Sequence, residues 1–138
     1  MPDYSYSSSG RGYAPWDYAG FSTNFHRVVV ESGVTYLGDY SFLRSHVETV
    51  YIAAASMGDN IFQESPYLRE VELAEGVTSI GGSNFRESPN LTKINIPGSV
   101  QTIGGYNFYE TPGLTSIGPV GSGASIAVHL KIFPSLCG

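Results

Sequence analysis

Few residues in this chain could do acid–base, nucleophilic or metal chemistry, and they are scattered. The histidines are His26, His46 and His129, and the single cysteine is Cys137. His26 and His46 each precede a strand-like segment and could lie near each other, yet no carboxylate or cysteine accompanies them at a ligand spacing. A single cysteine cannot form an internal disulfide or a multi-cysteine zinc site. We therefore expect surface or edge histidines and no metal site.

Serine and glycine patterns do not indicate catalysis either. No serine lies in a G-x-S-x-G motif, and none has an identifiable base. The segment GPVGSG, residues 118–123, faintly resembles a dinucleotide-binding turn, but its glycine order differs and Pro119 interrupts it. No acidic residue follows about 20 positions later to bind a ribose. We expect a non-enzymatic protein with no catalytic residue and no cofactor.

The overall composition narrows the class of partner. The 138 residues carry 7 Lys and Arg against 12 Asp and Glu, which gives a net charge of −5. Nucleic-acid binding is not expected, because phosphate recognition rests on clustered cations. No apolar run approaches the length of about 18 residues that a transmembrane helix needs. The start of the chain does not resemble a signal peptide, so the single expected domain is intracellular or the mature part of an exported protein.

The chain contains an internal sequence repeat, and the fold that this repeat forms must position any functional side chains. Residues 67–89 and 90–112 form two 23-residue blocks that share a frame of eight positions, among other matches. The frame positions are Leu68/Leu91, Val71/Ile94, Leu73/Ile96, Val77/Val100, Ile80/Ile103, Gly81/Gly104, Phe85/Phe108 and Pro89/Pro112. The frame extends upstream through glycines spaced by 20, 23 and 23 residues: Gly38, Gly58, Gly81 and Gly104. A further start at Leu114 and Ile117 is not expected to continue.

Each block predicts two short strands joined by a turn. The pattern apolar-x-x-apolar-x-apolar, as in Leu91, Ile94 and Ile96, ends in a strand with alternate residues inward. A turn at Pro97-Gly98 leads to the extended segment V-x-x-I-G, and the phenylalanine at the block end fills the core from the far side. Neighbouring blocks must stack, because none can bury its apolar side alone.

The predicted fold is a β-rich solenoid, a right-handed superhelix of short parallel strands with about four coils of roughly 23 residues. A β-sandwich with regularly spaced strands is the alternative. The solenoid is assigned to residues 24–118. Residues 1–23 are an irregular lead-in or cap, and residues 119–138 are an atypical C-terminal tail that serves as a cap or a contact segment.

One string carries a family resemblance. LTKINIPGSVQTIGGYNF fits L-x-x-I-x-I-P-x-S-V-x-x-I-G-x-x-x-F and resembles the leucine-rich repeats of BspA-like bacterial surface proteins. The resemblance extends over about residues 25–118 and implies a curved leucine-rich-repeat solenoid, export or surface display, and an adhesion or binding role. This chain departs from the pattern in having few repeats. It also has Glu64-Ser65, Glu87-Ser88 and Glu110-Thr111 where a small residue or Cys follows the phenylalanine, so the full-length protein could be longer.

Two surfaces are candidates for binding. The first is the outward strand face, which consists of the residues between the inward ones: Arg27, Val29, Thr49, Tyr51, Glu70, Glu72, Lys93 and Asn95. The second is the apolar run IAVHLKIF, residues 126–133, which either caps the last coil or joins two chains. Its candidate contact residues are Ile126, Val128, Leu130, Ile132 and Phe133. In the lead-in, Trp16 is either part of a cap or a platform for stacking sugars.

The sequence thus predicts a protein-interaction or adhesion module of an exported or cell-surface bacterial protein, which binds a protein or peptide through the strand face. One alternative is a structural module that forms homo-oligomers through its C-terminal end. Another is a carbohydrate-binding module at Trp16.

Overall fold

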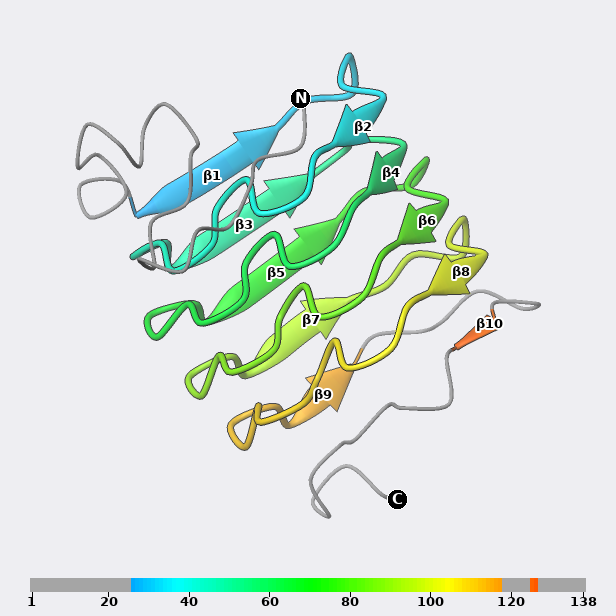
Figure 1. The fold of residues 1–138 in the computed structure, drawn as a ribbon. Coiled ribbons are helices and arrows are strands. Elements are labelled where there is room, and N and C mark those ends of the chain that lie inside the picture. Colours follow the sequence, from blue (N-terminus) through cyan, green and yellow to red (C-terminus); the bar gives the residue numbers. More distant parts are fainter. Residues whose placement is uncertain (1–25, 118–124, 127–138) are drawn as a thin grey trace.

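The computed structural model describes residues 26–117 and 125–126, which wind into a solenoid of about four turns (Figure 1). The first sheet contains β1 (Arg27–Val30), β3 (Thr49–Ile52), β5 (Glu70–Leu73), β7 (Lys93–Asn95) and β9 (Ser116–Ile117), in that order. The second contains β2 (Tyr36–Leu37), β4 (Ser56–Met57), β6 (Ser79–Ile80), β8 (Thr102–Ile103) and β10 (Ser125–Ile126). All pairs are parallel, so the predicted solenoid is confirmed. The described residues include no helix that could cross a membrane.

The strands pair in the register of the sequence repeat. The inward row of the first sheet is Val28, Val50, Val71, Ile94 and Ile117. The inward row of the second sheet is Leu37, Met57, Ile80 and Ile103. Every member of both rows is buried except Ile117, which is partly buried. In each row, similar apolar side chains stack on one another, because an equivalent side chain recurs at the same place in every coil.

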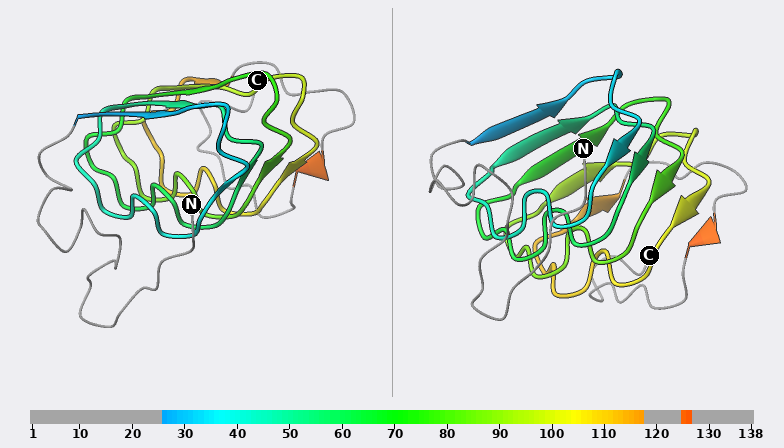
Figure 2. Two further views of the ribbon diagram at one scale, coloured as in Figure 1. Left: turned by 90° about the horizontal axis from the view of Figure 1, so that it is seen from above. Right: turned by 45° about the horizontal axis from the view of Figure 1, so that its top comes forward.

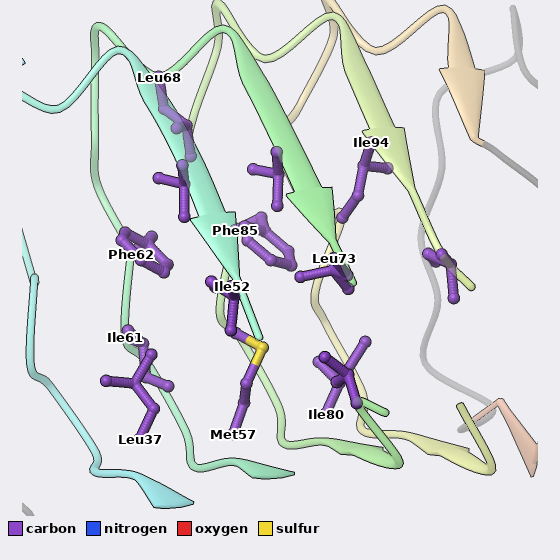
Figure 3. Close-up of a cluster of buried hydrophobic side chains, with 14 of the residues drawn as sticks. Leu37, Ile52, Met57, Ile61, Phe62, Leu68, Leu73, Ile80, Phe85 and Ile94 are labelled. Carbon is purple, nitrogen blue, oxygen red and sulfur yellow. The ribbon is translucent and has the colours of Figure 1, made fainter. Parts of the chain in front are cut away.

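Phenylalanines fill the core from the third side of the solenoid, opposite the first sheet. The ring centroids of Phe42 and Phe62 are 5.3 Å apart, those of Phe62 and Phe85 are 6.2 Å apart, and those of Phe85 and Phe108 are 6.1 Å apart. Figure 3 shows the Phe62 and Phe85 rings side by side. Such stacked pairs add about 0.5–1.5 kcal/mol each beyond the area that they bury. The predicted filling role of the frame phenylalanine is confirmed.

The third side is joined from coil to coil by backbone hydrogen bonds, although it contains no strand. Eight non-glycine residues there have φ between 55° and 61°, two in every coil: Tyr40, Arg44, Asn60, Glu64, Ser83, Glu87, Tyr106 and Glu110. The Glu64 N–H donates to the Arg86 carbonyl and the Glu87 N–H to the Tyr109 carbonyl, both at 2.9 Å. Left-handed conformations cost about 1–3 kcal/mol at non-glycine residues and persist only where surrounding bonds hold them.

Two buried asparagines extend this hydrogen bonding into the core. Asn84 Oδ1 accepts from the Ile61 N–H, and Asn107 Oδ1 accepts from the Asn84 N–H, both at 2.9 Å. Asn84 Nδ2 donates to the Gly58 carbonyl at 2.9 Å. Each amide therefore bonds backbone groups of a preceding coil, and it keeps buried polar groups satisfied where no strand ladder reaches.

The second sheet extends further than the sequence suggests. The repeat was not expected to continue after Ile117, but β10 pairs with β8, and Ile126 lies opposite Ile103. The signal is present in the spacing, since Ile117 and Ile126 are as far apart in sequence as Ile94 and Ile103. The repeat pattern did not reveal this strand, because position 123 has glycine where the frame has valine. The expectation that the frame ends after Ile117 is wrong at this strand.

Several predicted features lie outside the described residues. These are the lead-in with Trp16, the segment 118–123, and the residues His129, Cys137, Val128, Leu130, Ile132 and Phe133. Viewed along the stack in Figure 2 (left), the described coils overlay one another, and the first sheet forms one continuous side.

Candidate functional site: the strand face

The strand face is the outer surface of β1, β3, β5 and β7, where alternate side chains point away from the core. Two rows of side chains run across these strands in register. The first row is Arg27, Thr49, Glu70 and Lys93, and the second row is Val29, Tyr51, Glu72 and Asn95. Neighbours within a row are separated by about 4.8 Å, the distance between paired strands. The structure thus brings together the eight residues proposed from the sequence for this face.

A hollow of about 520 Å³ lies in the strand face. It is lined by Arg27, Thr49, Val50, Tyr51, Glu70, Val71, Glu72, Lys93 and Asn95. Val29 does not line the hollow, but it is 51% exposed in the second row beside Tyr51. An exposed valine next to a partly buried tyrosine gives one part of the face an apolar character. The rest of the face is polar and mixed in charge.

The charged side chains of the face are not paired with one another. Among the described residues, Glu70, Glu72 and Lys93 form no side-chain hydrogen bond or ion pair, although Glu70 and Lys93 are register partners. Arg27, at the β1 end, forms no such bond with any residue of 26–117. These charges remain available to a partner without the loss of an existing contact.

A second hollow of about 380 Å³ opens at the start of β5 and β7. Its lining residues are Glu48, Tyr67, Arg69, Glu70, Asn90 and Thr92. Arg69 Nε lies 3.7 Å from Glu48 Oε1, and the Tyr67 ring is 51% exposed. Of these residues, only Glu70 was predicted from the sequence as part of a binding surface. Their places in the repeat could have predicted them, because Tyr67 and Arg69 lie in the turn that leads into a strand of the face.

The histidines fall in ordinary surface environments. His26 Nδ1 lies 3.3 Å from Glu48 Oε2, an exposed contact of a kind that contributes little to stability. His46 packs edge-on against Tyr67, with ring centroids 4.9 Å apart. The two histidines therefore contact different residues rather than each other. In residues 26–117 no three His, Cys, Asp or Glu side chains come together as metal ligands would.

The geometry defines the class of protein. Short parallel strands stacked on one side, in segments of the kind shown by LTKINI (residues 91–96), are the architecture of a leucine-rich-repeat solenoid. The chain belongs to the family described as the BspA type leucine rich repeat region, whose sequence model matches residues 17–126 in six copies. Leucine-rich-repeat domains generally bind proteins and are generally not enzymes.

A solved structure has the same fold. It is a leucine-rich repeat protein from Eubacterium ventriosum, which superposes with a TM-score of 0.61 over 89% of this chain at 24% identity. The present chain spans 37% of that protein. Comparison with curated proteins gives no match.

Proposed function

We propose that this chain is a non-enzymatic protein-binding module that receives its partner on the strand face. The observation that carries the proposal is the hollow of about 520 Å³, to which four successive strands contribute side chains. Because each coil is fixed to its neighbours by backbone ladders, the backbone positions that carry the side chains around the hollow are set before a partner arrives. Preorganisation of this kind lowers the entropic cost of binding.

The chemistry of the face suits a protein partner. Val29 and Tyr51 supply apolar and aromatic contact area, and aromatic residues are enriched at the centres of protein interfaces. Arg27, Glu70 and Lys93 surround this area with both signs of charge. Mixed charges at a rim set orientation and partner choice more than affinity.

We further propose that the module belongs to an exported or surface-displayed protein and serves adhesion. The support is the BspA-type family, whose members are commonly surface-located or exported. A longer protein would present more coils of the same kind, and an extended solenoid offers a correspondingly longer face to its partner.

The experiment compares two tyrosines on different sides of the solenoid. Tyr51 lines the hollow, and Tyr106 is 41% exposed on the third side. Purified wild-type, Tyr51→Ala and Tyr106→Ala proteins are tested by biolayer interferometry against a panel of immobilised extracellular proteins. For any protein that binds the wild type, Tyr51→Ala should raise Kd by about tenfold, as expected for an interface tyrosine, and Tyr106→Ala by less than about twofold.

An equal rise in Kd for the two variants, or no rise for Tyr51→Ala, would show that the strand face is not the binding site. Surface display is tested separately on intact cells of the source organism, with an antibody against this chain and external protease. A signal that appears only after lysis contradicts it.

A further inference from the structure

Glu70 occupies the junction of the two hollows. It lines both the hollow of about 520 Å³ in the strand face and the hollow of about 380 Å³ at the start of β5 and β7. The two hollows therefore adjoin at Glu70 and together outline a path from Tyr67, in the turn before β5, onto the strand face. A path of this shape fits an extended chain better than a compact small molecule.

The charges along this path are asymmetric. On β5 both outward side chains, Glu70 and Glu72, are acidic and exposed. Among the described residues no cation forms an ion pair with either carboxylate: Lys93, the register partner of Glu70, makes none, and Arg69 lies beside Glu48, with 3.7 Å between Nε and Oε1. Two carboxylates on one strand, about 7 Å apart by strand geometry, thus face a hollow that Arg27 and Lys93 also line, and neither carboxylate is held in an ion pair among the described residues.

The apolar part of the face lies directly beside these carboxylates. In the second row the order is Val29 on β1, Tyr51 on β3 and Glu72 on β5. Tyr51 and Glu72 are register partners, so their Cα atoms are about 4.8 Å apart. A ligand that complements this order places an apolar side chain over Val29 and Tyr51 and a cation over β5.

We propose that the partner of the strand face is an extended peptide segment with a lysine or arginine within two residues of a large apolar side chain. The cationic group lies between Glu70 and Glu72, and the apolar side chain lies over Tyr51. This inference rests on the proposed function and specifies its ligand. Side chains on one face of an extended peptide recur about every 7 Å, which is enough to reach from Tyr51 across the roughly 4.8 Å between β3 and β5 to the β5 carboxylates. Anionic polymers are disfavoured, because the same carboxylates repel them.

The test uses a phage-displayed library of random dodecapeptides selected on the wild-type chain, followed by Kd measurements on synthetic copies of the enriched peptides. The variant is Glu70→Gln/Glu72→Gln. The matched control, Glu31→Gln/Glu75→Gln, removes the same charge from exposed residues outside the hollows. We expect enriched peptides to combine a basic and an apolar residue. Their Kd should rise at least about tenfold in the variant and less than about twofold in the control, and it should rise with salt for the wild type.

Each other outcome decides the question. Enriched peptides without a basic residue, or peptides that bind the variant as well as the wild type, overturn the inference. If those peptides still lose binding in Tyr51→Ala, the strand face remains the site. If they do not, the proposed function fails with the inference. If no peptide is enriched, the extended-peptide ligand is wrong, and the panel of folded extracellular proteins still tests the strand face independently.

Discussion

Replacement of Gly81 by alanine tests whether the coils pack as closely as the structure shows. A Cβ atom on Gly81 would lie 2.2 Å from the Gly58 carbonyl oxygen, 2.6 Å from the Gly58 carbonyl carbon and 2.3 Å from Asp59 Oδ1. The first two obstacles are backbone atoms of the preceding coil, which cannot rotate away. The coils cannot separate either, because the Gly81 N–H donates to the Met57 carbonyl at 2.9 Å and the ladder continues on both sides.

The size of the effect follows from the kind of obstacle. Overpacking usually costs about 1–3 kcal/mol when neighbouring side chains can move. Since backbone must move here, we expect Gly81→Ala to lower the free energy of unfolding by about 3 kcal/mol, a large part of the roughly 5–15 kcal/mol typical of a domain. Gly98 is the matched control, because a Cβ there meets nothing within 4 Å. Gly98→Ala should change stability by less than about 1 kcal/mol, with a small gain if the unfolded chain loses entropy.

The assay is urea unfolding followed by far-ultraviolet circular dichroism. With a slope of about 2 kcal/mol per molar urea, a loss of 3 kcal/mol lowers the midpoint by about 1.5 M. The slope must be unchanged for this conversion, since stacked repeats can lose cooperativity. A Gly81→Ala midpoint within about 0.5 M of the wild type would refute the reasoning. An equal drop in Gly98→Ala would show that the effect is not steric.

Two further predictions concern buried polar groups. Thr111→Val should lower the free energy of unfolding by about 1 kcal/mol, because the Thr111 hydroxyl donates to the Phe108 carbonyl at 2.7 Å. Ser65→Ala should leave it unchanged or raise it, because Ser65 Oγ is buried without a hydrogen-bond partner among the described residues. The same unfolding assay checks both, and a larger loss for Ser65→Ala than for Thr111→Val would contradict the assignment. Asn107→Ala should cost about 2–3 kcal/mol, because it leaves the buried Asn84 N–H unsatisfied. Hydrogen exchange at the Asn84 amide should accelerate, and unchanged protection of that amide would contradict its hydrogen bond to Asn107.

Much of the strand face could be predicted from the sequence. Period-two alternation in EVEL is enough to place Glu70 and Glu72 outward, because successive residues of a strand point to opposite sides. RVVV does not alternate in polarity, and the repeat frame, in which Val28 and Val30 are inward, places Val29 outward. The second hollow could not be predicted in this way. It forms where turns from neighbouring coils meet, so Tyr67 and Asn90 become neighbours only after the coils stack.

The left-handed residues of the third side show another limit of the sequence. Asn60 is a usual choice for positive φ, but Arg44 and Glu64 are not. Their conformation is imposed by hydrogen bonds to the next coil: the Arg44 N–H donates to the Gln63 carbonyl at 3.0 Å, and the Glu64 N–H donates to the Arg86 carbonyl at 2.9 Å. Local residue preference is therefore overruled by the ladder between coils.

The sequence by itself determined the repeat length, the inward rows and hence the solenoid. Those features depend on which apolar residues recur along the chain, and a recurring frame with a one-sided apolar pattern can bury it only by stacking. The tertiary structure decided which glycines touch the preceding coil, which charges of the strand face remain unpaired and where the hollows open. These properties depend on distances of a few ångströms between residues about 23 positions apart, and spacing in the sequence does not set such distances.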